Sequence, residues 1–530
     1  MKRRTIAAAM LVGLSFSSVQ AEWSSFRNGG ASVAETLPTK WDPESTKWQL
    51  ELTGYGQSTP VILGDRVFVA SVVGGMKENC LIQCIGLTDG KEQWRYEMPS
   101  AKQSASNYMA SRAAPTPVVD KDGVYVFFET GDLVCVDLSG EKVWHRDLSE
   151  EFGEFENNHG LGSSPAHNST HLFINLEHRG PSHLVAVRKD NGESEWKAER
   201  PSGSSWSSPI VVDNKSGSQV IVSSAGAVTS YNADSGSELW AVDGLDGNSV
   251  PSPTVHDGKL FIGARLPEFA EEGSIRSNCC LDIANSTGKT PEVLWRADKA
   301  ISDYASPVVV GDFVYFINKV GVLHCLDAAD GKLHYRKRLE APSWATPIAS
   351  GENLYLFGKD GSTQIVAAGE EYKLVSTNRL WDPQSPPKPE HYVEFTGGGH
   401  GHGSHGASSG GSHGSAPPKG GDASESAGPG ASGRRPGGGM MAALMRGDAN
   451  GDGMLEGDEI SANFRPMLAR IDKNGDGKLD SKELEAMAKS FAERRAGSRT
   501  SAKDPIVYGA AASNGALVIR TGTRLYCITQ

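Results

Sequence analysis

The sequence predicts an all-β fold, an eight-bladed β-propeller that is closed by its N-terminal strand and interrupted by a small α-helical insertion. Three observations lead to this prediction. A two-part unit of four short strands recurs along the chain, and a single stretch, residues 382–504, breaks the series. The last unit lacks its fourth strand, while the start of the chain supplies an unpaired strand of that kind.

The first half of each unit joins a small residue and a proline to two apolar strands. Its copies begin at Ser58, Ala114, Ser163, Ser207, Pro251, Ala305 and Ala345, and a degenerate copy begins at Ala510. Apolar residues alternate at period two between turns rich in Gly, Asp and Asn, which is typical of half-buried strands. Repeats of about 40–50 residues with this pattern indicate propeller blades.

A tryptophan marks the last strand of most units. These residues are Trp48, Trp94, Trp144, Trp196, Trp240 and Trp295, with Tyr335 in the next place. On the outer strand of a blade, an indole can cover the seam with the next blade, so we interpret the series as structural. Trp48 precedes the first complete unit, and the eighth unit ends without such a strand. The strand around Trp48 is therefore predicted to complete the last blade and to protect its edge.

Composition divides the chain into five segments. Residues 1–21 have a basic start, an apolar run and small residues before Glu22, as a signal peptide does. We therefore expect an exported protein, either periplasmic or secreted, and no later segment is apolar enough to cross a membrane. The other segments are the main propeller (22–381), a disordered linker rich in Gly, Ser, His and Pro (382–439), a helical insertion (440–497) and the last blade (504–530).

Charge and cysteine content narrow the range of functions. The net charge is −12 and no basic stripe is present, which argues against nucleic acid as a partner. The seven cysteines are widely spaced, and an odd number leaves at least one unpaired or paired to another chain. Several occur in apolar strands, where a free cysteine acts as a small hydrophobe. We expect a monomer.

Two loops in the insertion, Asp448–Glu459 and Asp472–Glu483, have the EF-hand pattern of acidic and amide residues, a central Gly and a final Glu. Two calcium ions are therefore predicted as cofactors. Their ligands would be Asp448, Asn450, Asp452, the Met454 carbonyl, Glu456 and Glu459 in the first loop, and Asp472, Asn474, Asp476, the Lys478 carbonyl, Asp480 and Glu483 in the second. Leu455 and Leu479 are expected to join the loops through a short sheet.

Two further groups of residues each leave two interpretations open. The linker histidines could bind zinc, copper or nickel, or simply form part of a solvated tether: His400, His402, His405 and His413. The residues before the small-Pro steps should approach the central channel and either line a ligand pocket or plug the channel. They are Gln57, Ala114, Gly162, Trp206, Val250, Tyr304 and Trp344, with Arg112, His159 and Asp303 nearby.

Together, the two half-repeats resemble the pyrroloquinoline-quinone-like (PQQ-like) β-propeller repeat family. The resemblance covers residues 23–381 and 505–530, including the opening WSSFRNGG and the closing ALVIRTGTRLYCI. It implies an eight-bladed ring. It also implies one of two functions, because the family contains quinone-dependent alcohol and sugar dehydrogenases and non-enzymatic scaffolds of outer-membrane protein assembly.

The dehydrogenases of this family pair the quinone with calcium held by pocket carboxylates, and often stack it between a Trp and a vicinal disulfide. The resemblance would give these roles to Trp206 or Trp344, to Asp303 and to Cys279-Cys280. However, this cysteine pair falls late in the ring, and no cluster of carboxylate and Asn residues marks a calcium–quinone site. We therefore predict a binding scaffold for a protein or small-molecule ligand, with a PQQ-dependent alcohol or sugar dehydrogenase as the alternative.

Overall fold

The chain forms two compact units, one made of Met1–Phe395 with Lys503–Gln530 and the other of Thr396–Ala502. The computed structural model describes residues 22–104, 110–157, 159–214, 217–265, 277–284, 286, 289–298, 300–390 and 505–530, and within the insertion residues 454–456, 476, 478–480, 482 and 483. The predicted signal peptide and the four linker histidines lie outside these residues. No helix in the described part of the chain is long and apolar enough to cross a membrane.

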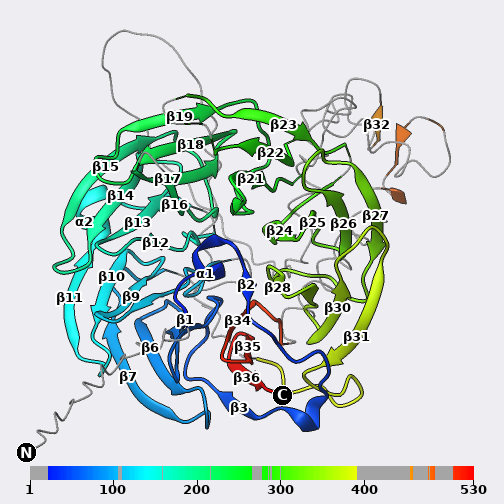
Figure 1. Cartoon of the computed structure of the whole chain (residues 1–530). Helices are drawn as coiled ribbons and strands as arrows, with labels where there is room; N and C mark the ends of the chain where they lie inside the picture. Colours follow the sequence, from blue (N-terminus) through cyan, green and yellow to red (C-terminus); the bar gives the residue numbers. More distant parts are fainter. Residues whose placement is uncertain are drawn as a thin grey trace, which may run out of the picture. The chain divides into compact units, whose positions relative to one another are not determined.

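Eight antiparallel sheets stand around a central axis, which confirms the predicted propeller (Figure 1). The first four blades contain β4 (Val61–Leu63), β5 (Arg66–Val73), β6 (Asn79–Gly86) and β7 (Glu92–Pro99); β8 (Val118–Asp120), β9 (Gly123–Phe127), β10 (Asp132–Val136) and β11 (Lys142–Asp147); β12 (Ala166–His167), β13 (His171–Leu176), β14 (Ser182–Arg188) and β15 (Ser194–Arg200); and β16 (Ile210–Asn214), β17 (Gly217–Ser224), β18 (Ala227–Asn232) and β19 (Glu238–Val242). In each blade, the first strand is innermost and the fourth is outermost.

The remaining blades repeat this order, and apolar side chains from neighbouring sheets form the core between them. They contain β20 (Thr254–His256), β21 (Lys259–Ile262), β22 (Cys279–Asp282) and β23 (Glu292–Arg296); β24 (Val308–Val310), β25 (Phe313–Ile317), β26 (Val322–Asp327) and β27 (Leu333–Arg338); β28 (Ile348–Ser350), β29 (Asn353–Phe357), β30 (Ser362–Ala367) and β31 (Lys373–Arg379); and β34 (Gly509–Ser513), β35 (Ala516–Arg520), β36 (Arg524–Ile528) and β3 (Trp48–Glu51). Short helical turns lie at α1 (Arg27–Gly30), η1 (Pro43–Ser45) and α2 (Leu148–Phe152).

The ring closes through strand β3, as the sequence predicts. β3 pairs antiparallel with β36, in a register that places Trp48 opposite Cys527 and Glu51 opposite Arg524. β3 is thus the outermost strand of the eighth blade (Figure 1). Without it, the backbone of β36 would present a free hydrogen-bonding edge.

The recurring tryptophans cover the seams between blades, which confirms their structural interpretation. Trp144, in the second blade, donates from its indole Nε1 to the carbonyl oxygen of Lys189 in the third, at 2.8 Å. Its ring lies against Gly192, where φ is +76° and an added Cβ would come within 2.7 Å of the indole. Four other seams repeat the indole-to-carbonyl bond: Trp48 to Leu87, Trp94 to Leu138, Trp196 to Ala233 and Trp295 to Ala328.

The small residue before each proline also has a structural role, which the sequence analysis did not identify. Its backbone N–H donates to the side-chain hydroxyl of the equivalent residue in the next blade, at 2.9–3.1 Å. This bond is repeated six times, from the first blade to the seventh. The hydroxyls belong to Thr116, Ser164, Ser208, Ser252, Ser306 and Thr346. Gly509 takes this place in the eighth blade, where Thr59 leaves no room for a Cβ.

The N-terminal segment, residues 22–41, crosses the centre of the ring, and we call it the strap (Figure 1). It pairs with the first blade through β1 (Glu22–Trp23) and with the seventh through β2 (Val33–Ala34). Between them, Arg27 donates to the carbonyl oxygens of Ser252 and Pro253 in the fifth blade, at 3.2 and 3.1 Å. Burial lowers the pKa of Arg27 to about 9. The strap therefore ties together blades on different sides of the channel.

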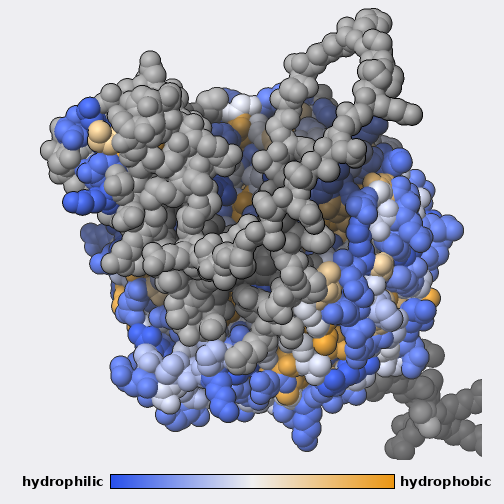
Figure 2. Space-filling view, turned by 180° about the vertical axis from the view of Figure 1, so that it is seen from behind, coloured by the Kyte–Doolittle hydropathy of each residue, from blue (hydrophilic) through white to orange (hydrophobic). Residues whose placement is uncertain are grey.

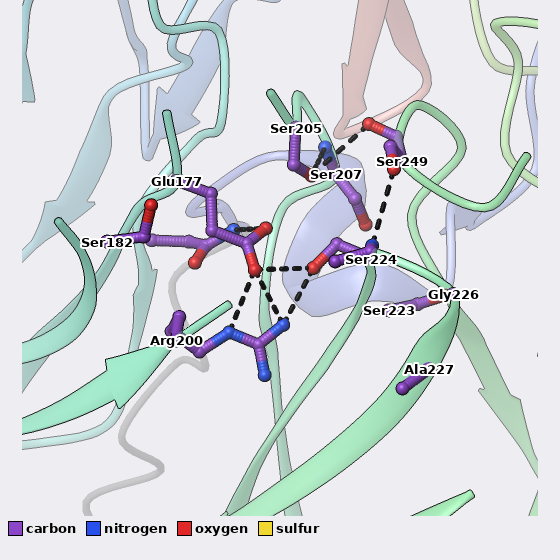
Figure 3. A network of polar contacts seen from close by, with 12 residues as sticks. Glu177, Ser182, Arg200, Ser205, Ser207, Ser223, Ser224, Gly226, Ala227 and Ser249 are labelled. Carbon is purple, nitrogen blue, oxygen red and sulfur yellow. Dashed lines mark hydrogen bonds and ion pairs between the residues drawn. The ribbon is translucent and has the colours of Figure 1, made fainter. Parts of the chain in front are cut away.

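A buried ion pair of the third blade, Glu177 with Arg200, is hydrogen-bonded to the fourth blade. The Arg200 guanidinium lies 2.7 Å from a carboxylate oxygen of Glu177, and each side chain is 1% exposed. Arg200 also donates to the hydroxyls of Ser224 and Tyr231, and Ser224 in turn donates to Glu177 at 2.7 Å. Figure 3 shows the carboxylate, guanidinium and Ser224 hydroxyl converging from these two blades. Such a pair is stable in the interior only while both partners are present.

The propeller unit continues beyond the linker boundary predicted at residue 382. Glu390 is 4% exposed, and its carboxylate accepts hydrogen bonds from the backbone N–H groups of Gly522 and Thr523, at 2.8 and 3.1 Å. It also forms an ion pair with Arg524 at 3.4 Å. Residues 382–390 are therefore anchored to the eighth blade by a single acidic side chain, which composition alone did not reveal.

On the face drawn in Figure 2, most of the described residues that are visible are hydrophilic. Across all the described residues, the exposed large apolar side chains are Val33, Val143, Leu294, Val320, Leu333, Leu374 and Val375. Single exposed apolar residues are normal on a folded protein and need no partner. These apolar residues therefore do not indicate a binding site, and the candidate site lies in the loops around the channel.

Candidate functional site

The loops that lead into the inner strands gather at one end of the channel, which we call the mouth. Gln57 and Arg112, from the first two of these loops, are joined by two hydrogen bonds. The Gln57 N–H donates to the Arg112 carbonyl oxygen at 3.0 Å, and the Arg112 N–H donates to Gln57 Oε1 at 2.9 Å. Because the strands of each blade are antiparallel, the turn between its second and third strands also lies at the mouth.

Aromatic rings form a row at the mouth, which we call the aromatic row: Tyr304, Trp344, Tyr508 and Tyr55. Their centroids are separated in turn by 5.6, 6.1 and 6.2 Å. The hydroxyls of Tyr55 and Tyr508 are hydrogen-bonded at 2.8 Å. Tyr55 is buried, whereas the other three rings are partly exposed. The row therefore presents aromatic surface from the sixth, seventh and eighth blades.

Two cationic side chains lie over rings of this row. The Lys359 Nζ is 3.8 Å from the centroid of Trp344, and the Arg112 guanidinium carbon is 4.5 Å from that of Tyr55. Burial lowers the pKa of Lys359. An ammonium over an indole face is a favourable contact, worth about 1 kcal/mol at a partly exposed site. The mouth thus combines aromatic surface with positive charge.

The three residues predicted to bind a cofactor have different neighbours. Trp344 belongs to the aromatic row, and Asp303 directly precedes Tyr304 of that row. Asp303 Oδ2 accepts a hydrogen bond from the Lys319 N–H at 2.8 Å. Trp206 instead donates from Nε1 to the Gly160 carbonyl oxygen at 3.0 Å and packs on His159. In the described residues no ring contact joins Trp206 to the aromatic row. The roles of these three residues remain a prediction.

Cys279 and Cys280 are adjacent core residues of an apolar strand, the interpretation that the sequence favours over a vicinal disulfide. Both thiols are buried in β22 and neither is in a disulfide. Because neighbouring residues of a strand point to opposite faces, Cys279 packs with Leu245 and Ile262, and Cys280 with Trp295. Burial raises the pKa of each thiol to about 12. The pair is part of the core between blades.

The described part of the insertion carries the short sheet expected between two EF-hand loops. β32 (Leu455–Glu456) pairs antiparallel with β33 (Lys478–Leu479), and Leu455 lies opposite Leu479. Both leucines are buried. The predicted ligands Asp448, Asn450, Asp452, Glu459, Asp472 and Asn474 lie outside the described residues.

The second loop also has local bonds that suit a calcium site. The Glu483 N–H donates to Asp480 Oδ1 at 2.8 Å, and Glu483 Oε2 accepts from the Asp480 N–H at 3.3 Å. Asp476 Oδ1 accepts from the Lys478 N–H at 2.9 Å. These contacts hold Glu483 at the last loop position, where an EF-hand uses a bidentate carboxylate. The residues present therefore fit calcium, a hard cation that prefers oxygen ligands.

We expect calorimetric titration of the whole protein to give about two calcium sites. Glu459→Gln and Glu483→Gln should each remove one, because each replaces a bidentate carboxylate with a weaker neutral ligand. A chelator should leave the melting of the propeller unchanged, because few contacts are expected to couple the insertion to the ring. A chelator that strongly lowers the melting temperature of the propeller would contradict this independence.

Comparison with known proteins places the propeller among described families. The family model of the outer membrane protein assembly factor BamB matches residues 36–203, 138–266 and 281–391. An EF-hand model matches residues 464–488, which include the second loop. The BamB proteins of Shewanella oneidensis and Salmonella typhimurium are 26% and 25% identical over 271 and 212 residues, or 49% and 40% of this chain. These matches span 64% and 48% of the two relatives, less than two thirds of either.

Two solved structures have a similar fold. BamB from Moraxella catarrhalis gives a TM-score of 0.46 at 13% identity, over 63% of this chain and 87% of that chain. A europium-containing methanol dehydrogenase gives a TM-score of 0.46 at 12% identity, over 68% of this chain and 85% of that chain. At these scores and identities, neither structure bears on the function of this chain.

Proposed function

The chain belongs to the family of the outer membrane protein assembly factor BamB, and from this premise we propose that it is an exported, calcium-binding scaffold. Its propeller would bind a protein or small-molecule partner at the mouth, and its insertion would hold two calcium ions. Export would depend on residues 1–21, with a periplasmic or secreted destination. We expect the protein to act as a monomer.

The observation that supports this proposal is the composition of the mouth. Its row of partly exposed aromatic rings with cations beside them suits recognition of a partner. In the described residues, no group of three or more His, Cys, Asp or Glu side chains lies close enough together to hold a metal ion. The described residues of the mouth offer aromatic packing and positive charge, which supports the binding of a partner.

Calcium in the proposed scaffold would have a structural role. The two EF-hand loops share one short sheet, so filling one site would help to order the other. The calcium-loaded form would hold the two loops together where Leu455 lies opposite Leu479.

The test of the proposal is an assay for the alternative function. The purified protein is incubated with PQQ and calcium, and dye reduction is followed with a panel of alcohols and sugars. We expect no turnover above that of a control without protein. Robust turnover that disappears in Asp303→Ala would overturn the scaffold proposal. Asp312→Ala, a substitution of another sixth-blade aspartate in the turn between β24 and β25, is the matched control.

A further inference from the structure

Lys359 differs from the buried lysines of the propeller, Lys77 and Lys189, in having no acidic partner among the described residues. Lys77 lies 3.1 Å from Glu129, and Lys189 lies 2.7 Å from Asp120. For Lys359, no carboxylate oxygen of the described residues is within ion-pair distance of Nζ. A partly buried ammonium without a counter-charge is poorly solvated, so a carboxylate brought to it would be bound favourably.

The backbone holds Lys359 firmly at this place. Its N–H donates to the Pro342 carbonyl oxygen at 2.8 Å, and its own carbonyl oxygen accepts from the Val507 N–H at 3.4 Å. These bonds fix the turn between β29 and β30 against the loops that carry Trp344 and Tyr508. The cation is therefore positioned by two blades, and its ammonium lies over Trp344.

The exposed rings form a continuous row against which an extended polypeptide can lie. The centroids of Tyr304, Trp344 and Tyr508 follow one another at 5.6 and 6.1 Å, so each ring contacts the next. Side chains on one face of an extended chain, at positions i and i+2, are separated by about 6.6 Å, twice the rise of a strand residue. Two alternate side chains of such a peptide could therefore pack against two neighbouring rings of the row. A single small aromatic molecule would contact only part of the row.

We propose that the mouth binds an extended peptide segment that carries aromatic or large apolar side chains at alternate positions and a carboxylate beside them. The apolar side chains pack along Tyr304, Trp344 and Tyr508, and the carboxylate pairs with Lys359. This inference rests on the scaffold function proposed above and specifies the chemistry of its partner. An acidic, aromatic segment of another exported protein would satisfy it.

The test uses the mature full-length protein and three fluorescent peptides of equal length. The first contains Phe-Thr-Phe-Asp in a Gly- and Ser-based sequence with blocked ends, the second replaces Asp with Asn, and the third replaces both Phe with Ala. Fluorescence anisotropy gives the dissociation constants. We expect the Asp peptide to bind about tenfold more tightly than the Asn peptide, as one charge-assisted bond allows, and the Ala peptide not to bind.

Two substitutions assign the contacts. Lys359→Gln should abolish the preference for Asp over Asn while leaving binding of the Asn peptide unchanged. Trp344→Ala should weaken both Phe peptides, and Trp344→Phe is the milder replacement if the alanine variant does not fold. The matched control is Lys337→Gln, which removes another lysine over an aromatic ring, at 5.0 Å from Tyr372, from the outer strand β27. The control should bind all three peptides like the parent.

Each other outcome separates the two proposals. Equal binding of the Asp and Asn peptides, lost in Trp344→Ala, would overturn the role of Lys359 and leave the scaffold function intact. Absence of binding by either Phe peptide, or binding that neither mouth substitution changes, would overturn the peptide site. The scaffold function would then still be decided by the dye-reduction assay, which does not depend on these peptides.

Discussion

Removal of residues 22–53 is expected to reduce the free energy of unfolding by an amount on the order of 10 kcal/mol. The deleted segment contains the strap and strand β3, with five large buried side chains: Trp23, Leu37, Trp41, Trp48 and Leu52. Each contributes about 1.5–3 kcal/mol by leaving water. Since the stability of a domain is itself about 5–15 kcal/mol, the eighth blade should not remain folded.

Thermal unfolding and light scattering measure this effect, because loss of β3 also exposes the edge of β36 to association. Two smaller changes separate the causes. Leu50→Pro interrupts only the pairing of β3 with Leu525, and deletion of residues 22–34 removes most of the strap while keeping β3. Calcium binding by the insertion should survive all three changes. A variant without residues 22–53 that melts like the parent would show that the ring closes without them.

Glu177→Gln is expected to destabilise the propeller by about 3–5 kcal/mol, because it leaves the Arg200 guanidinium charged and buried without a counter-ion. The amide oxygen can still accept hydrogen bonds from Arg200 and Ser224, but it carries no negative charge to balance the guanidinium. Both residues belong to the third blade, but both also bond to Ser224 of the fourth, so the loss should loosen that seam. Chemical denaturation, with the midpoint and slope compared with those of the parent, measures the change.

The double variant Glu177→Leu with Arg200→Met is the control for this prediction. Removing both charges at once avoids the unpaired ion, so we expect most of the lost stability to return. Arg188→Gln serves as a surface control, since Arg188 pairs with Asp190 at the exposed end of β14 and should change stability by less than about 1 kcal/mol. If Glu177→Gln cost no more than Arg188→Gln, the buried pair would not stabilise the seam.

The repeat pattern was sufficient to predict the blades, and the physical reason is visible at the seams. Each indole packs closely on a turn of the next blade, where only a residue without a Cβ fits, as Gly192 does against Trp144. Those two residue types therefore recur together and mark the unit. The closure by Trp48 could be predicted for the same reason, because an outer strand without inner strands must pair elsewhere.

The strap could not be predicted, because its strands are too short to carry a period. β1 and β2 have two residues each, and Arg27 between them has a φ of 56°, which no alternation of apolar residues signals. Arg27 donates to backbone carbonyl oxygens, and because every residue has one, the sequence does not indicate which of them it will bind. Glu390 was missed for a similar reason, since two of its partners are the backbone N–H groups of Gly522 and Thr523.

The mouth was predicted in part. Tyr304 and Trp344 were found because they precede a recognisable proline step, but Tyr508 belongs to the degenerate copy, where Gly509 and Ala510 replace the small-Pro pair. Lys359 comes from a turn between two strands of the seventh blade, and nothing local connects that turn to Trp344. This contact joins two loops of one blade and depends on the conformation of both loops, which the strand pattern does not contain.

The pairing of β3 with β36 also sets the order in which the molecule can fold. Trp48 and Cys527 lie roughly 480 residues apart, so their contact must wait until almost all of the chain is available, and it closes a very long loop. Pairings this distant in sequence form slowly, whereas each blade is built from local hairpins that form early. During synthesis and export, the chain would therefore pass through an open arc with a free strand at its growing end. Closure of the ring is expected to be the late, slow phase of refolding, abolished by loss of β3.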